Sequence, residues 1–107
     1  MCEFQSLVHN STGYIIRCYE CKSIQLAFGT TLATMNTERF QWIAQNISME
    51  YLYRNPGADP EVKKIVISID KQTMLCLSFN ELEKLHHMFL QAGALLEVYG
   101  LLEKEEI

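Results

Sequence analysis

The sequence predicts an α+β fold in which two antiparallel β-hairpin or strand units are each followed by a helix, with the helices packed on one sheet. In two regions of the chain, apolar and polar residues alternate, which is the period of a half-buried strand. Each region is followed by a segment whose apolar residues recur three and four positions apart, as in an amphipathic helix. Because 107 residues suffice for one hydrophobic core, we expect a single domain over residues 1–107.

The first unit opens with a hairpin. The β-rich runs Phe4–His9 and Tyr14–Tyr19 flank Asn10–Gly13, a turn-forming segment that ends in glycine. An antiparallel register with Asn10 opposite Gly13 fixes the pairs further along both strands. The expected pairs are His9 with Tyr14, Glu3 with Glu20, and Cys2 with Cys21.

The run Ile24–Met35 continues this unit as one long strand or two short ones, because Gly29 offers a bulge or bend in its middle. An amphipathic helix follows, with Thr37 as the expected N-cap. Trp42 falls off the apolar stripe of this helix, and we expect it to pack at the edge of that stripe. The stripe itself consists of Phe40, Ile43, Ala44, Ile47 and Tyr51.

The second unit is another hairpin, formed by Lys64–Asp70 and Thr73–Phe79. A short polar loop between the two apolar runs pairs Ile67 with Leu75 and puts the apolar residues on one face. This register turns Cys76 to the other face of the hairpin.

The last helix is expected to begin at a capping box of Asn80 and Glu83 and to reach about Lys104. Its main apolar stripe consists of Leu82, Leu85, Phe89, Ala92, Leu96 and Tyr99. A second stripe consists of Met88, Leu95, Val98 and Leu102. One neighbouring element cannot cover both stripes in a small domain, so we expect a homodimer that buries the second stripe. The alternative is that the first helix or the N-terminal hairpin covers it.

Composition excludes several classes of protein. The formal net charge is −4, and the nine Lys and Arg residues are scattered, which argues against nucleic-acid binding. Apolar runs are too short to span a membrane. The first residues lack a basic region followed by an apolar stretch, so we expect a cytoplasmic protein whose thiols stay mostly reduced.

Cys18 and Cys21 are the one cysteine pair spaced for joint chemistry. A Cys-x-x-Cys turn suits a tetrahedral metal, a disulfide or a redox couple, and the spacing does not choose among them. The hairpin brings Cys2 to the same end, so Cys2, Cys18 and Cys21 are candidate ligands of a structural Zn²⁺. The sequence leaves the fourth ligand open among Glu3, Cys76, His86 and His87.

These residues favour a non-enzymatic binding or interaction domain stabilised by zinc. The alternative is a thiol–disulfide redox protein that uses Cys18 and Cys21. We consider it weaker, because activated thiols commonly sit at the start of a helix, whereas a strand is expected after Cys21. The pair His86 and His87 suggests no catalytic set, since consecutive helical residues diverge around the axis; we expect one to pack and one to face water.

Four features of the first third of the chain resemble a family of short, functionally uncharacterised bacterial proteins. These features are Cys2, Gly13-Tyr14, Cys18-x-x-Cys21, and Gln25-Leu26-Ala27-Phe28-Gly29-Thr30. The resemblance implies a compact domain with an N-terminal cysteine near a Cys-x-x-Cys hairpin. It implies no known reaction.

Overall fold

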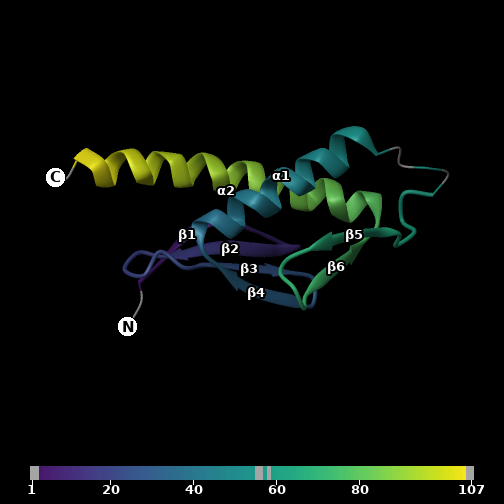
Figure 1. The fold of residues 1–107 in the computed structure, drawn as a ribbon, viewed down its shortest axis with the longest axis horizontal. Coiled ribbons are helices and arrows are strands. Elements are labelled where there is room, and N and C mark those ends of the chain that lie inside the picture. Colours follow the sequence, from purple (N-terminus) through teal and green to yellow (C-terminus); the bar gives the residue numbers. More distant parts are fainter. Residues whose placement is uncertain (1–2, 55–56, 58, 106–107) are drawn as a thin grey trace.

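The fold was analysed in a computed structural model that describes residues 3–54, 57 and 59–105. The described residues form strands and helices in the order that the sequence predicts, and the α+β class is confirmed (Figure 1). The elements are β1 (Phe4–Asn10), β2 (Gly13–Cys18), β3 (Ile24–Phe28), β4 (Thr31–Met35), α1 (Thr37–Tyr53), β5 (Ile65–Ser68), β6 (Met74–Leu77) and α2 (Phe79–Glu105). The strands divide into a four-stranded sheet with the order β1-β2-β3-β4 and a two-stranded sheet of β5 and β6.

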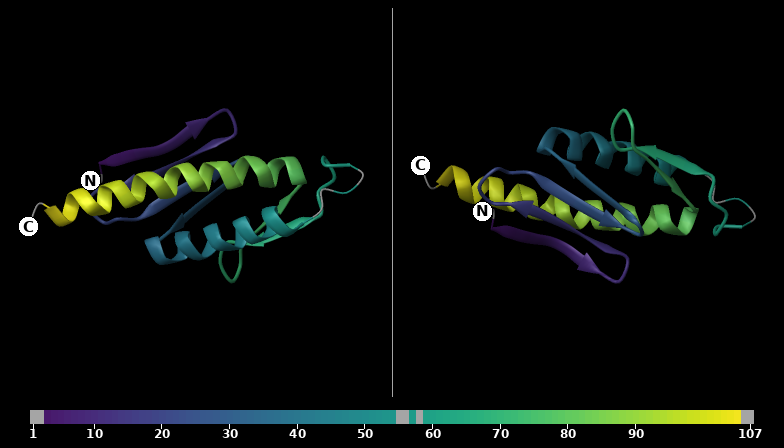
Figure 2. Two further views of the ribbon diagram at one scale, coloured as in Figure 1. Left: turned by 90° about the horizontal axis from the view of Figure 1, so that it is seen from above. Right: turned by 90° about the horizontal axis from the view of Figure 1, so that it is seen from below.

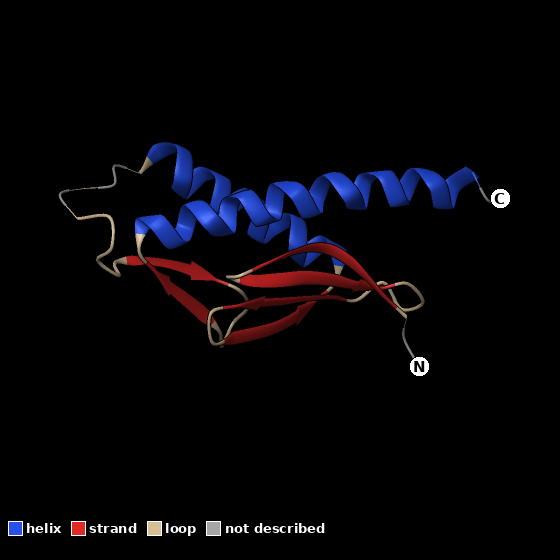
Figure 3. Ribbon diagram, turned by 180° about the vertical axis from the view of Figure 1, so that it is seen from behind, coloured by secondary structure: helices blue, strands red, loops and turns tan. Residues whose placement is uncertain are grey.

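Both helices lie on the same side of the two sheets, which gives one helical layer and one strand layer (Figure 3). α2 runs along the four-stranded sheet, and α1 lies beside α2 near the β5–β6 hairpin (Figure 2). The core fills the space between the layers. In it, Phe40 of α1 stacks on Phe89 of α2 with ring centroids 4.7 Å apart. The predicted apolar stripe of α1 is thus the face that packs on α2 and the sheets.

The β1–β2 register agrees with the prediction only near the turn. His9 pairs with Tyr14 and Val8 with Ile15, but a bulge between Ser6 and Val8 shifts the remaining pairs by one residue. The Tyr19 N–H consequently donates to the Glu3 carbonyl at 2.8 Å. The predicted pairing of Glu3 with Glu20 is therefore wrong, and the bulge removes the like-charge contact that this pairing would have created.

The predicted pairing of Cys2 with Cys21 involves a residue outside those that the structure describes. At the other end of the hairpin, Gly13 packs so closely on β3 that a Cβ atom there would collide with the Ala27 carbonyl oxygen. This contact explains the need for glycine at the turn.

Gly29 separates β3 from β4 with a positive φ of 59°, so the run from Ile24 to Met35 is two strands of a tight hairpin. The β5–β6 register is the predicted one, with Ile67 opposite Leu75. Cys76 is exposed on the outer face of that hairpin, as expected.

Both predicted N-caps are displaced toward the N-terminus. The cap of α1 is Asn36, not Thr37: its backbone is extended and its side chain accepts the Arg39 N–H at 2.8 Å. Asn36 takes this role because β4 ends at Met35, which leaves the next residue at the entry to the helix.

The capping box of α2 is Ser78 and Glu81, not Asn80 and Glu83. The Glu81 N–H donates to Ser78 Oγ at 3.1 Å, and the Ser78 N–H donates to Glu81 Oε1 at 3.0 Å. Burial tends to raise the pKa of Glu81, but hydrogen bonds from Lys63 and Ser78 outweigh it and leave that pKa lowered. β6 therefore stops at Leu77, two residues earlier than the predicted strand.

No helix in the described part of the chain combines the length and apolar character needed to cross a membrane. α2 is long, but charged and polar residues interrupt its apolar surface.

The cap of α1 can be tested with a pair of neighbouring substitutions. Asn36→Ala should lower the free energy of unfolding by about 1 kcal/mol, because the Arg39 N–H loses its acceptor. Thr37→Ala, at an exposed position, should change it by less than about 0.5 kcal/mol. Urea denaturation of the three proteins measures both values. Greater destabilisation by Thr37→Ala than by Asn36→Ala would restore Thr37 as the cap.

Candidate functional site

The Cys18–Cys21 turn connects β2 to β3 and is held by main-chain hydrogen bonds. The Cys18 N–H donates to the Ser23 carbonyl at 2.8 Å, and the Lys22 N–H donates to the Cys18 carbonyl at 2.9 Å. The Cys21 N–H points at sulfur and lies 3.4 Å from Cys18 Sγ. Lys22 has a φ of 64°, a left-handed conformation that favours glycine. The turn therefore curls around the Cys18 sulfur.

The two cysteines of this turn differ in environment. Cys18, the last residue of β2, is buried, whereas Cys21 is exposed. Cys18 is disulfide-bonded in the structure. Cys2, the third predicted zinc ligand, lies outside the described residues. Within the described ranges, no three His, Cys, Asp or Glu side chains come together as metal ligands.

The fold separates the four candidates for a fourth ligand. Glu3 lies beside the turn, because its carbonyl accepts the N–H of Tyr19. Cys76 belongs to β6, at the opposite end of the molecule (Figure 1). His86 and His87 belong to the first half of α2, near the same opposite end. Of the four, Glu3 alone is brought to the cysteine turn.

Two cations flank the turn. The Arg17 guanidinium is buried, donates from Nε and Nη2 to Gln5 Oε1 at 3.0 and 2.8 Å, and lies 5.2 Å from the centroid of the Tyr99 ring. Lys22 Nζ lies 4.5 Å from the centroid of the Tyr19 ring. Each of the two cations is thus held against an aromatic ring beside the turn.

A second polar cluster lies between α1 and α2. His86 is buried and stacks on Tyr51 with ring centroids 4.6 Å apart, while His87 is exposed. This outcome confirms that one histidine packs and the other faces water. Ser48 Oγ lies 3.5 Å from His86 Nδ1, a neighbour that the sequence did not reveal because the two residues are on different helices.

This cluster is not arranged as a catalytic triad. Glu83, on the same helix as the two histidines, accepts a hydrogen bond from the Tyr51 hydroxyl at 2.8 Å. That hydrogen bond raises the pKa of Tyr51. Burial, followed by the charge of His87, lowers the pKa of His86. We therefore interpret the cluster as a packing contact between α1 and α2 in which His86 is neutral.

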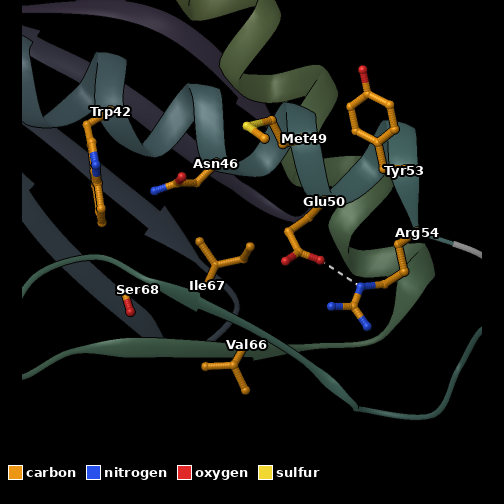
Figure 4. Close-up of a pocket in the computed structure, with 9 residues that line it drawn as sticks. All are labelled: Trp42, Asn46, Met49, Glu50, Tyr53, Arg54, Val66, Ile67 and Ser68. Carbon is orange, nitrogen blue, oxygen red and sulfur yellow. Dashed lines mark hydrogen bonds and ion pairs between the residues drawn. The ribbon is translucent and has the colours of Figure 1, made fainter.

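An open groove of about 800 Å³ runs between α1 and β5. Figure 4 shows Trp42 and Glu50 of α1, and Arg54 directly after that helix, projecting toward β5. Trp42 is 43% exposed, lies under the Arg39 guanidinium and lines this groove. Sequence periodicity placed Trp42 off the stripe but could not show what it would face.

The second apolar stripe of α2 is only partly on the surface. Met88 is 1% exposed and belongs to the core, and Leu95 packs partly against the core. Val98 and Leu102 are about half exposed, near the end of the helix. The expected surface row of four residues is therefore shorter than predicted, because β1 and β2 lie under the middle of α2 and cover part of it.

The neutral state of His86 makes stability depend on pH. Because its pKa is lowered in the folded protein, the unfolded chain binds the proton more readily once the pH falls to about 6.5. The free energy of unfolding should therefore decrease as the pH falls from about 7.5 to about 5.5. Asp70 and Glu81, whose pKa values are also lowered, titrate below this window.

Urea denaturation at both ends of this pH window tests the assignment. His86→Phe, which keeps an aromatic ring against Tyr51, should reduce the pH dependence. An equal pH dependence in wild type and His86→Phe would contradict the assignment.

Comparison with known proteins yields one family. Residues 1–107 match the family described as Family of unknown function (DUF6686). No curated protein and no solved structure matches the chain. The family match confirms the expectation of a functionally uncharacterised family. The chain therefore belongs to DUF6686, a family of unknown function.

Proposed function

We propose that this protein is a small, non-enzymatic, cytoplasmic interaction domain whose β1–β2 hairpin end is closed by a structural Zn²⁺. The proposed ligands are Cys2, Cys18 and Cys21, with Glu3 as the fourth. The observation that carries the proposal is the geometry of the turn, in which the Cys21 N–H points at Cys18 Sγ.

This geometry suits a metal-binding turn for two reasons. An N–H group directed at sulfur stabilises a thiolate, which is the form that ligates zinc. The left-handed Lys22 bends the chain directly after Cys21, so that both cysteines can face one point. Main-chain hydrogen bonds hold the turn itself, which would lower the cost of organising the ligands.

The ligand set has consequences for charge and redox state. Three thiolates and one carboxylate around Zn²⁺ carry a net charge of about −2. The cations Arg17 and Lys22 are the sequence neighbours of Cys18 and Cys21. A sulfur in a disulfide cannot also act as a thiolate ligand, so the proposal concerns the protein with Cys18 reduced. Reduced thiols are the usual state in the cytoplasm.

Elemental analysis tests the zinc site directly. Protein purified with a reductant and without a chelator should carry about one equivalent of zinc, because a structural site is close to fully occupied. Cys21→Ser should reduce the zinc content to less than about a tenth of an equivalent. Cys76→Ser is the matched control and should keep the wild-type content, since Cys76 lies on the outer face of the second hairpin.

Two further measurements complete the zinc test. Addition of EDTA should lower the melting temperature of wild type and of Cys76→Ser but not of Cys21→Ser, because the metal stabilises only the folded state that binds it. Glu3→Gln should weaken zinc binding without abolishing it. A zinc-free wild-type protein with freely reactive thiols would refute the proposal.

A thiol–disulfide redox protein using Cys18 and Cys21 is the second candidate, because the Cys-x-x-Cys spacing suits a redox couple. The disulfide that Cys18 makes in the structure does not join it to Cys21. The turn enters strand β3, so no helix N-terminus lies behind Cys21 to stabilise its thiolate. The redox candidate nevertheless predicts an activated thiol.

The rate of alkylation by iodoacetamide as a function of pH distinguishes this candidate. A redox-active Cys21 should react rapidly at or below neutral pH, and Cys76 provides an internal exposed reference. Peptide mass mapping assigns the rate of each cysteine. A Cys21 rate that stays low until about pH 8.5, like that of an ordinary thiol, would eliminate the redox candidate.

A further inference from the structure

Strand β5 has an open edge. Among the described residues it pairs only with β6. The Ile69 N–H donates to the Thr73 carbonyl at 2.9 Å, and hydrogen-bonded pairs alternate along an antiparallel ladder. By this alternation Ile67 also bonds to β6, and at the end of the ladder the Lys64 N–H donates to the Leu77 carbonyl at 3.1 Å. The same alternation directs the main-chain N–H and C=O groups of Val66 and Ser68 away from β6. These groups form the outer edge of the two-stranded sheet.

This edge borders the groove beside α1. Val66, Ile67 and Ser68 line the groove together with residues of α1 (Figure 4). A smaller hollow continues it past Trp42 toward Ile69 and Asp70. Large apolar side chains are exposed around the groove, namely Trp42, Met49, Tyr53 and Val66, with Tyr53 83% exposed. An open strand edge with exposed apolar residues is a surface that proteins usually cover.

The sequence of this segment is complementary to itself. It reads Lys64-Ile65-Val66-Ile67-Ser68-Ile69-Asp70. When two copies are aligned antiparallel about Ile67, isoleucine meets isoleucine and each lysine meets an aspartate. Lys64 and Asp70 are both exposed at the two ends of the segment.

We propose that β5 pairs antiparallel with β5 of a second copy of this chain, around a two-fold axis at Ile67. Val66 then lies opposite Ser68 of the partner subunit, and their outward N–H and C=O groups form hydrogen bonds on both sides of the axis. Lys64 and Asp70 flank β5 at its two ends, so each lysine comes to the same end of the paired strands as the partner's Asp70. The two β5–β6 hairpins become one four-stranded sheet. The exposed side chains of α1 then lie beside the paired β5 strands.

The charge pattern favours a second copy over a foreign strand. A two-fold axis satisfies both ends of the segment at once, because each copy supplies the lysine and the aspartate that the other needs. The pairing also explains why an apolar groove lies beside a hydrogen-bonding edge. The second stripe of α2 is a weaker candidate for the dimer interface than the β5 edge. Met88, one of its four residues, is buried in the core and cannot contact a partner. This inference is independent of the proposed zinc site.

Sedimentation equilibrium across micromolar concentrations tests the proposal on the full chain. Wild type should show a concentration-dependent shift from monomer to dimer mass. Lys64→Asp should raise the dimer dissociation constant at least about tenfold, because it sets like charges opposite each other twice. Lys71→Asp changes the net charge equally but lies in the hairpin loop, and it should leave the dissociation constant within about twofold.

Two more variants separate the possible interfaces. Val66→Pro removes an outward N–H that makes no bond to β6, so it should weaken the dimer while circular dichroism stays native. Leu102→Glu, on α2, should not weaken the dimer. A monomer at all concentrations would overturn the proposal. So would a dimer that Leu102→Glu dissociates and that Lys64→Asp and Val66→Pro leave intact, which would assign the interface to α2.

Discussion

The fold depends on the burial of one face of α2 against strands from both sheets. The described strands of the two sheets share no ladder, so hydrogen bonding alone does not join the β5–β6 hairpin to the rest of the domain. α2 contacts β1, β2 and β6 and packs along α1. Leu82 and Leu85, near its start, and Phe89 and Ala92, further along, are all buried. Burial of the leucine and phenylalanine side chains, at about 1.5–3 kcal/mol each, is therefore what holds the two strand units in one core.

This arrangement gives the two ends of the molecule different properties. At the cysteine turn, the four-stranded sheet is continuous, and Arg17 is buried between its Gln5 partner and the Tyr99 ring of α2. At the other end, the two-stranded hairpin is attached by side-chain packing and keeps its β5 edge exposed. A two-stranded sheet is marginally stable by itself, so packing under the helices is needed to maintain it. The proposed zinc site and the proposed dimer interface thus lie at opposite ends of the domain.

Local backbone features determine what the cysteine turn can do. The β-bulge between Ser6 and Val8 shifts the pairing of the start of β1 with β2 by one residue and brings Glu3 next to Tyr19. The left-handed Lys22 closes the turn around the Cys18 sulfur. A register without the bulge would have placed Glu3 against Glu20, with two like charges in contact. Which residues lie beside the turn therefore depends on the bulge in β1 as well as on the Cys-x-x-Cys spacing.

The sequence by itself determined the α+β class, the order of strands and helices, the register of the β5–β6 hairpin and the outward position of Cys76. These follow from residue periodicity and from turn-forming residues, which act over a few positions along the chain. Tertiary structure decided the caps at Asn36 and Ser78, because the end of a strand depends on where its partner stops pairing. It also decided the burial of Met88 and the stacking of His86 on Tyr51, since a helix face is covered only by what packs on it from elsewhere in the chain.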